Sequence, residues 1–169
     1  SDLDDVQEII EPSQSLNKLF VLKFAEEENY EREQVGSVLN LAPGERVQSA
    51  RFVGDRGYVV TFRQVDPLFT FDLSTPNEPI LEGKLKIPGF SNYIHPLGET
   101  HLLTVGPAGD DDGLNGEWQA QLFDVSDLKN PEQVDTLVPS KLKGGRAYSE
   151  AGWDHHAFTY DPESRLLVN

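Results

Sequence analysis

The chain has 169 residues, enough for one domain with its own hydrophobic core, and 37% of them are hydrophobic. Its 29 acidic and 14 basic residues give a formal charge of −15, which opposes binding to nucleic acid and docking on anionic lipid surfaces. The chain has no cysteine, which excludes disulfides and thiolate chemistry, and no apolar run long enough for a membrane span.

The first segment, residues 1–16, is an acidic lead-in. A short helix and a disordered stretch are both open alternatives for it. Methionine is absent, at position 1 as elsewhere, so we expect a processed or excised chain. The absence of a visible signal peptide therefore says nothing about secretion.

The segment 17–41 predicts two strands, residues 19–24 and 34–41, joined by a charged hairpin loop at 26–32. Both strands are short and rich in apolar residues. We interpret this segment as the last two strands of a repeating unit whose first two strands are missing.

The segment 47–88 has four short strand patterns separated by three turn signals. In the second pattern Tyr58 and Val60 fall on one face, and Val59 and Thr61 on the other. The last pattern alternates apolar and charged residues, as expected for a half-solvated outer strand. Four strands joined by three turns are typical of one blade of a β-propeller.

The same order of strands and turns returns in residues 91–138. The run Phe71-Asp72-Leu73-Ser74 recurs 52 positions later as Phe123-Asp124-Val125-Ser126, and Gly54 recurs as Gly98. A further unit begins near residue 150, with a first strand expected at 153–160 and a second at 165–169. A period near 50 residues with four strands a unit is the pattern of propeller repeats.

We therefore predict an all-β fold: a β-propeller fragment of about three four-stranded antiparallel blades, with split half-blades at both termini. The expected units are a half-blade 17–41, full blades 47–88 and 91–138, and a half-blade 150–169. Closed propellers typically have four to eight blades. Either the termini pair across two copies or the chain is an arc of a longer polypeptide, and its open blade edges predict self-association.

Three sequence runs look familiar in combination: RFVGDRGYVVTFRQVDPLFTFDLSTPNEP from Arg51, LFDVSDLKNP from Leu122 and WDHHAFTYDPES from Trp153. Together they resemble bacterial secreted proteins that have a C-terminal β-propeller domain. The resemblance implies export and an extracellular or cell-surface location. It brings no catalytic residues with it.

The second full unit contains an acidic, glycine-rich insertion at 106–116, which we expect to form a loop. Oxygen ligands on such a loop suit calcium, the one metal or cofactor that the sequence suggests. The spacing departs from the helix-loop-helix calcium pattern at Leu114, and a solvated hairpin loop is the alternative. The candidate ligands are Asp110, Asp111, Asp112, Asn115 and Glu117.

A second candidate site lies where the innermost strands line the axis of a propeller. His155 and His156 are adjacent, so on a strand they point to opposite faces. We expect His95 and one of this late pair to face a shared cavity, with Asp154 nearby. Structural hydrogen bonding is the alternative role for these histidines.

Two functions follow from these observations. In the first, the chain is a non-catalytic module that presents a surface or axial pocket to a protein, peptide or glycan partner. In the second, it is a metal-assisted hydrolase whose site at the channel mouth uses His95, Asp154 and His156. Whether those three side chains converge decides between them.

Overall fold

The computed structural model describes residues 16–25, 31–62, 66–89, 91–110, 113–139, 149–150, 154, 157–161, 163–164 and 166–168. These residues form β-strands joined by turns. The first six strands are β1 (Asn17–Phe24), β2 (Arg32–Leu41), β3 (Arg46–Val53), β4 (Arg56–Phe62), β5 (Asp66–Asp72) and β6 (Ile80–Ile87). The remaining strands are β7 (Tyr93–Leu97), β8 (His101–Asp110), β9 (Gly113–Asp124), β10 (Glu132–Leu137), β11 (Thr159–Asp161) and β12 (Leu166–Val168).

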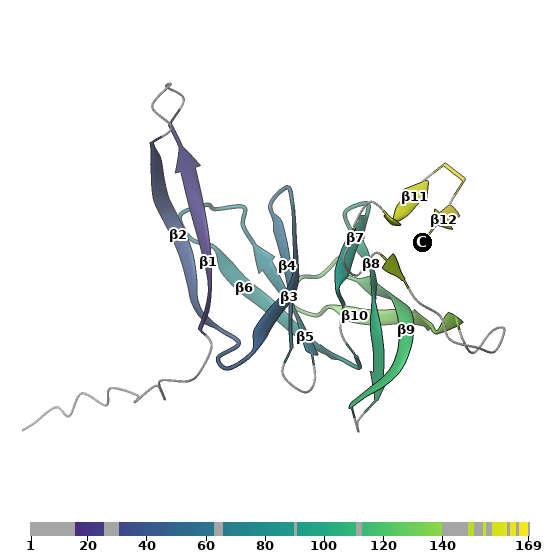
Figure 1. Ribbon diagram of the computed structural model, residues 1–169. Helices are drawn as coiled ribbons and strands as arrows, with labels where there is room; N and C mark the ends of the chain where they lie inside the picture. The colour runs from purple at the N-terminus through teal and green to yellow at the C-terminus, as the bar shows by residue number, and fades with distance from the viewer. Residues whose placement is uncertain are drawn as a thin grey trace, which may run out of the picture.

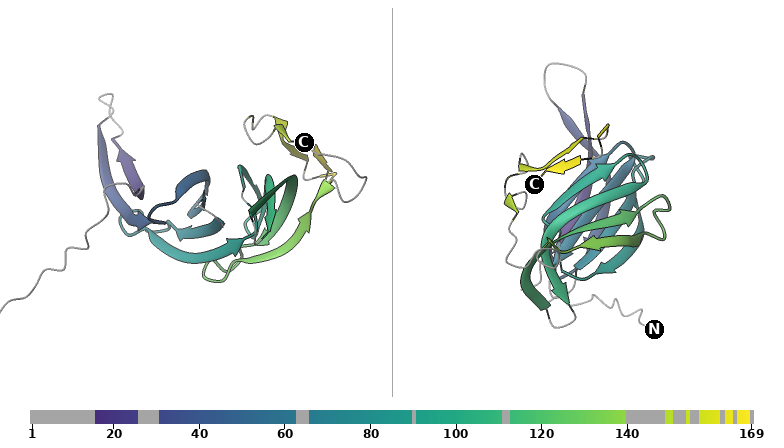
Figure 2. Two further views of the ribbon diagram at one scale, coloured as in Figure 1. Left: turned by 60° about the horizontal axis from the view of Figure 1, so that its bottom comes forward. Right: turned by 90° about the vertical axis from the view of Figure 1, so that its right-hand side faces the viewer.

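The strands form four separate antiparallel sheets (Figure 1). Two are four-stranded, with orders β3-β4-β5-β6 and β7-β8-β9-β10, and two are hairpins, β1-β2 and β11-β12. Figure 2 shows the sheets standing one after another along an open arc, with the β1-β2 hairpin at one end and the β11-β12 hairpin at the other. The all-β prediction, with four-stranded antiparallel blades and a half-blade at each end, is confirmed.

The hydrophobic core lies between the sheets. Strand β4 is buried on both faces because a sheet packs against each of them. Tyr58 and Val60 belong to a cluster shared with the β7-β10 sheet, where Phe123 is fully buried. Val59 belongs to a cluster shared with the β1-β2 hairpin, where Phe71 is fully buried. A smaller cluster joins the β7-β10 sheet to β11.

The two recurring sequence runs form the same local structure. Asp72 Oδ1 accepts a hydrogen bond from the Ser74 amide at 2.8 Å, and Asp124 Oδ1 accepts one from the Ser126 amide at 2.8 Å. Each bond begins the turn into the outer strand of its sheet. Gly54 and Gly98 both have positive φ, 54° and 66°, as the tight turn between the first two strands requires.

At two of the junctions between sheets, a glycine on the outer strand lies in close contact with a turn of the next sheet. A Cβ on Gly83 of β6 would lie 2.2 Å from the Leu128 carbonyl oxygen, and a Cβ on Gly36 of β2 would lie 2.3 Å from that of Pro76. In both outer strands a register shift precedes the glycine. The side chain of Thr70 donates to the Leu128 carbonyl at 2.5 Å.

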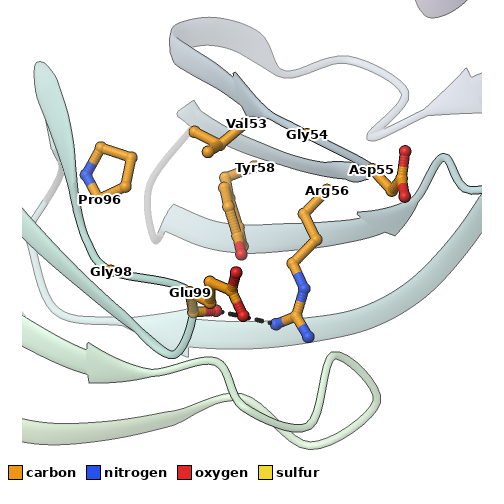
Figure 3. Close-up of a pocket in the computed structure, with 8 residues that line it drawn as sticks. All are labelled: Val53, Gly54, Asp55, Arg56, Tyr58, Pro96, Gly98 and Glu99. Atoms are coloured by element: carbon orange, nitrogen blue, oxygen red, sulfur yellow. Dashed lines mark hydrogen bonds between the residues drawn. The ribbon is translucent and has the colours of Figure 1, made fainter.

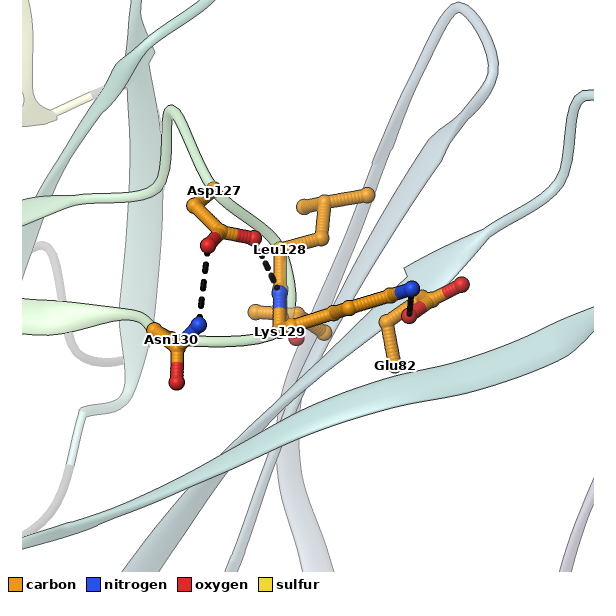
Figure 4. A network of polar contacts seen from close by, with 6 residues as sticks. Glu82, Asp127, Leu128, Lys129 and Asn130 are labelled. Carbon is orange, nitrogen blue, oxygen red and sulfur yellow. Dashed lines mark hydrogen bonds and ion pairs between the residues drawn. The ribbon is translucent and has the colours of Figure 1, made fainter.

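The turn beside Gly83 is further held by polar contacts (Figure 4). Asp127 accepts hydrogen bonds from the Lys129 amide at 2.9 Å and from the Asn130 side chain at 2.8 Å. The Lys129 ammonium lies 3.7 Å from the Glu82 carboxylate on the preceding sheet. The Lys129 side chain is 71% exposed, so water screens this ion pair and the close backbone contact dominates the joint.

The expected loop at 106–116 is wrong in part. Strand β8 runs on to Asp110 and β9 starts at Gly113, and the ladder pairs Gly109 with Leu114. The buried parts of β8 and β9 already hold the ends of these two strands, the β8-β9 arms, side by side. Further backbone pairing between the arms therefore costs little conformational entropy. The glycine-rich, acidic composition predicted a loop because it ignores that tertiary restraint.

The expected first strand at 153–160 is also too long. Among its described residues, strand β11 contains only Thr159 and Tyr160, and it continues to Asp161. The Asp154 amide donates to the Glu150 carbonyl at 2.8 Å, and the Ala157 amide donates to the Asp154 carbonyl at 3.1 Å. These local bonds close turns before the strand begins.

Candidate binding site

Aromatic side chains from two separate sheets gather around His95 on the inner strand β7. The ring of Phe158 lies 4.8 Å from the Tyr93 ring and 4.9 Å from the His95 imidazole, and Tyr160 lies 5.8 Å from that imidazole. The Tyr93 hydroxyl is 3.4 Å from His95 Nδ1. Tilted and edge-on rings at these separations are favourable packing geometries.

A cavity of about 440 Å³ opens beside this cluster. Its described lining is His95, Pro96, Leu97, Gly98 and Tyr160, so it lies between the inner strand of the second four-stranded sheet and β11. Alternation along β7 places Tyr93, His95 and Leu97 on one side of the strand. The packing of β11 against β7 thus brings residues 65 positions apart in the chain into one site.

Burial lowers the pKa of His95 from its usual 6.5, and the positive charge of Arg51 lowers the pKa further. Both effects penalise the imidazolium. The imidazole is therefore neutral at physiological pH and offers one donor and one acceptor. A neutral histidine among aromatic rings suits ligand recognition by packing and hydrogen bonding.

A second cavity, of about 310 Å³, shares Pro96 and Gly98 with the first (Figure 3). Here Arg56, which follows the first turn of the β3-β6 sheet, crosses to the neighbouring sheet. Its guanidinium donates to the Glu99 carbonyl at 3.1 Å and to the Val125 carbonyl at 2.8 Å. These bonds tie the adjacent turns together along the same inner rim.

Tyr58 also lines the second cavity. Burial raises the pKa of Tyr58, and the Arg56 guanidinium partly offsets this by a hydrogen bond and its charge. The phenol therefore stays protonated and able to donate a hydrogen bond near neutral pH. Arg56 and the backbone of the two turns give the wall of the second cavity its polar groups.

The structure places one of the sequence-predicted binding residues, His95, in the first cavity. Asp154 is exposed and is not among the residues that line this cavity. His155 and His156 lie outside the described residues. The expected convergence of His95, one histidine of the late pair and Asp154 stays a prediction.

Three of the five calcium candidates lie on strands β8 and β9. Asp110 ends β8, opposite Gly113, and Asn115 and Glu117 lie two positions apart on β9. Asp111 and Asp112 lie outside the described residues. Within the described part of the chain, no three side chains of histidine, aspartate or glutamate are grouped to hold a metal.

Sequence reasoning missed most of the groups around His95. Tyr160 lies on a predicted strand, but its distance to His95 depends on how two sheets stand side by side. Alternation gave a usable signal for Tyr93, which is two positions from His95. Arg56 lies two positions after Gly54 in a turn signal, and nothing in its local sequence indicates a contact with the next sheet.

Four-stranded sheets stacked along an arc, with their inner strands around a shared rim, define a β-propeller module. Comparison of the sequence with known families agrees: residues 7–169 match the family described as the β-propeller domain. The chain therefore belongs to that family. No solved structure matches it significantly.

Two relatives are uncharacterized archaeal proteins. One, from Methanocaldococcus jannaschii, is 42% identical over 133 residues, which is 79% of this chain and 20% of the relative. The other, from Archaeoglobus fulgidus, is 38% identical over 135 residues, which is 80% of this chain and 20% of the relative. The chain thus spans about a fifth of the length of these relatives. The propeller part of the resemblance is confirmed, whereas these relatives are archaeal and not bacterial.

No helix in the described part of the chain has the length and apolar character needed to cross a membrane.

Proposed function

We propose that this chain is a non-catalytic binding module whose inner rim holds a segment of a protein, peptide or glycan partner. The observation that carries the proposal is the cavity beside His95, which β7 and Tyr160 of a second sheet line and which a cluster of aromatic rings adjoins. Binding sites are typically concave, rich in aromatic side chains and equipped with a few polar groups that set orientation. Tyr160 supplies the aromatic wall, and His95 supplies the polar group.

The side chains around His95 limit the chemical class of ligand that the first cavity can bind. Aromatic rings and a neutral imidazole suit a ligand segment with a flat apolar face and a few hydrogen-bonding groups. The Arg51 guanidinium near His95 disfavours a cation at this point. A formal charge of −15 over the whole chain disfavours strongly acidic partners. A neutral peptide or glycan segment satisfies both limits.

The hydrolase alternative has less support. Of the groups assigned to it, His95 is the one that lines the cavity among the described residues. Asp154 is exposed on a turn before β11.

Two further proposals come from the sequence. The resemblance of the three sequence runs supports an exported, extracellular or cell-surface location. Protease treatment of intact native cells that express the full reading frame tests this location. The protease would digest a protein at the cell surface and leave one inside the cytoplasm intact. The oxygen-rich β8-β9 arms support calcium binding, and an unchanged melting curve after chelation and calcium addition would exclude it.

The test of the binding site begins with peptide and glycan arrays probed with the 169-residue chain. For a ligand found there, Tyr160→Ala and His95→Ala should each weaken binding by about tenfold or more, or roughly 1.4 kcal/mol. Thr159→Ala is the matched control, because Thr159 neighbours Tyr160 on β11 and is exposed. Unchanged affinity in both cavity variants, with wild-type unfolding curves, would show that the ligand binds elsewhere.

A further inference from the structure

Within the described residues, the two ends of the arc are complementary half-sheets. The β1-β2 hairpin corresponds to the third and fourth strands of the complete sheets, and the β11-β12 hairpin corresponds to the first and second. In both complete sheets the second strand pairs with the third, as β4 does with β5 and β8 with β9. Within the described residues, β1 is paired on one edge only, and so is β12.

Register shifts fix the correspondence between the sheets. The shift lies between Val21 and Leu22 in the first hairpin and between Thr70 and Phe71 in the next sheet. In the third sheet the corresponding shift follows the pair of Phe123 and Gln133. Leu22 therefore occupies the position of Phe71 and Phe123, by strand pairing as well as by sequence.

This correspondence shows that the outer face of the β1-β2 hairpin is built to be covered. Phe71 and Phe123 are both 0% exposed because each packs on the preceding sheet, whereas Leu22 is 45% exposed. Phe20 and Phe24, two positions to either side on the same face of β1, are 49% and 61% exposed. A row of three exposed apolar side chains on one face is unusual for a solvated sheet.

The groove beside β1 has the same character. A cavity of about 220 Å³ lies between the β1-β2 hairpin and the β3-β6 sheet, and Val47, Ala50 and Phe52 line it from β3. Phe52 is 53% exposed there. In the complete sheets, the corresponding space beside the third strand is filled by the first two strands of the same sheet. The groove is thus shaped for a two-stranded hairpin.

At the other end of the arc, the face of the β7-β10 sheet that would receive the next outer strands is also open. Leu137 of β10 is exposed, and it pairs with Ala120 on the face that packs toward β11. The position that corresponds to Gly83 is Asp135, so a joint of the Gly83 type cannot recur there unchanged. The β1-β2 connection, residues 25–31, likewise lacks the proline that Pro79 and Pro131 provide in the other two turns.

We propose that two copies of this chain close a ring of six sheets, in which β12 of one copy pairs antiparallel with β1 of the other. Two half-sheets become one complete sheet at each of two identical junctions, and the row Phe20, Leu22 and Phe24 packs on the open face of the partner's second four-stranded sheet. Six sheets fall within the four to eight of closed propellers. The closed ring pairs the two edges, of β1 and of β12, that the half-sheets leave open.

The register at the junction follows from the complete sheets. His101 pairs with Asp124 and Leu102 with Phe123, and Asp161 pairs with Leu166 as Leu97 pairs with His101. Leu167 of one copy should therefore lie opposite Leu22 of the other. Opposed residues of an antiparallel pair have Cα atoms about 4.5–5.5 Å apart, within the range that a disulfide bridges.

The chain has no cysteine, so a mixed-disulfide experiment has no background. Leu22→Cys and Leu167→Cys are purified separately, mixed and oxidised, and the expected product is a disulfide between two different chains. Leu81→Cys replaces Leu22→Cys in the control, because Leu81 is 41% exposed on β6 and lies away from the junction. A chain that carries both Leu22→Cys and Leu167→Cys shows whether the bond can form within one molecule. A disulfide that forms only within that double variant, or preferentially between two Leu22→Cys chains, would overturn the proposal.

The mass in solution gives an independent readout. Light scattering from about 5 to about 500 µM should show a rise from 18.9 kDa to twice that mass. Because each copy carries a charge of −15, added salt should shift the transition to lower concentration. Leu22→Asp should abolish the dimer while Leu81→Asp retains it. A chain that stays monomeric throughout would refute the ring, whatever the inner-rim pocket binds.

Discussion

Replacing Gly83 by alanine tests the joint between neighbouring sheets. The new Cβ would lie 2.2 Å from the Leu128 carbonyl oxygen, 2.8 Å from Thr70 Oγ1 and 3.0 Å from Pro131 Cδ. Two of these three contacts are closer than real Cβ atoms allow, and one of the two is to backbone. The turn must therefore move away from β6.

The expected cost has two parts. Overpacking a close joint costs about 1–3 kcal/mol. Displacing the turn also breaks the 2.5 Å hydrogen bond from Thr70 to the Leu128 carbonyl, worth about 0.5–1.5 kcal/mol. The free energy of unfolding should fall by about 2–4 kcal/mol, which lowers the melting temperature of a chain of this size by roughly 5–15 °C.

Urea unfolding followed by circular dichroism measures the change. Leu81→Ala is the matched control, because this exposed side chain lies two residues away on the same strand and its loss should cost less than about 0.5 kcal/mol. If Gly83→Ala unfolds within about 0.5 kcal/mol of the wild type, with an unchanged m-value, the close joint does not stabilise the fold and the reasoning is wrong.

Two further predictions concern the inner rim. Arg56→Met should lower the free energy of unfolding in a urea titration by about 1–2 kcal/mol, because charge-assisted hydrogen bonds to two carbonyls are lost. Arg32→Met is the control and should have little effect, because Arg32 is exposed at the start of β2. Because the pKa of His95 is lowered in the folded chain, the unfolded chain binds the proton more readily. The contribution of neutral His95 to stability is therefore complete above pH 6.5 and is lost as the pH falls through the folded-state pKa. His95→Gln should therefore flatten the dependence of the free energy of unfolding on pH between about 7.5 and 5, and equal slopes for the two proteins would contradict this.

Much of the fold was predictable because strand formation is local. The alternation at Tyr58, Val59 and Val60 predicted a strand with side chains on two faces, and the structure buries both faces. The recurrence of Phe71 as Phe123 predicted repeated sheets, and the two residues occupy the same position in their ladders. Period-2 patterns and turn signals depend only on neighbours in the chain.

Predictions failed where composition competed with a tertiary restraint. The 106–116 insertion looked like a loop, but the buried parts of β8 and β9 extend their pairing to Asp110 and Gly113. The end of the chain looked like an eight-residue strand, but local bonds at Asp154 delay β11 until Thr159. Neither outcome is visible in the pattern of apolar and polar residues.

By itself, the sequence determined the class of fold, the repeated unit and the position of His95 on an inner strand. Only the tertiary structure decided which side chains surround that histidine, that Arg56 bridges two sheets, and that Gly36 and Gly83 accept the turns of their neighbours. The physical reason is that these contacts lie between sheets, and their geometry depends on how separately formed ladders pack around a common rim. Local pattern does not encode that packing, since the ladder hydrogen bonds of each sheet lie within that sheet.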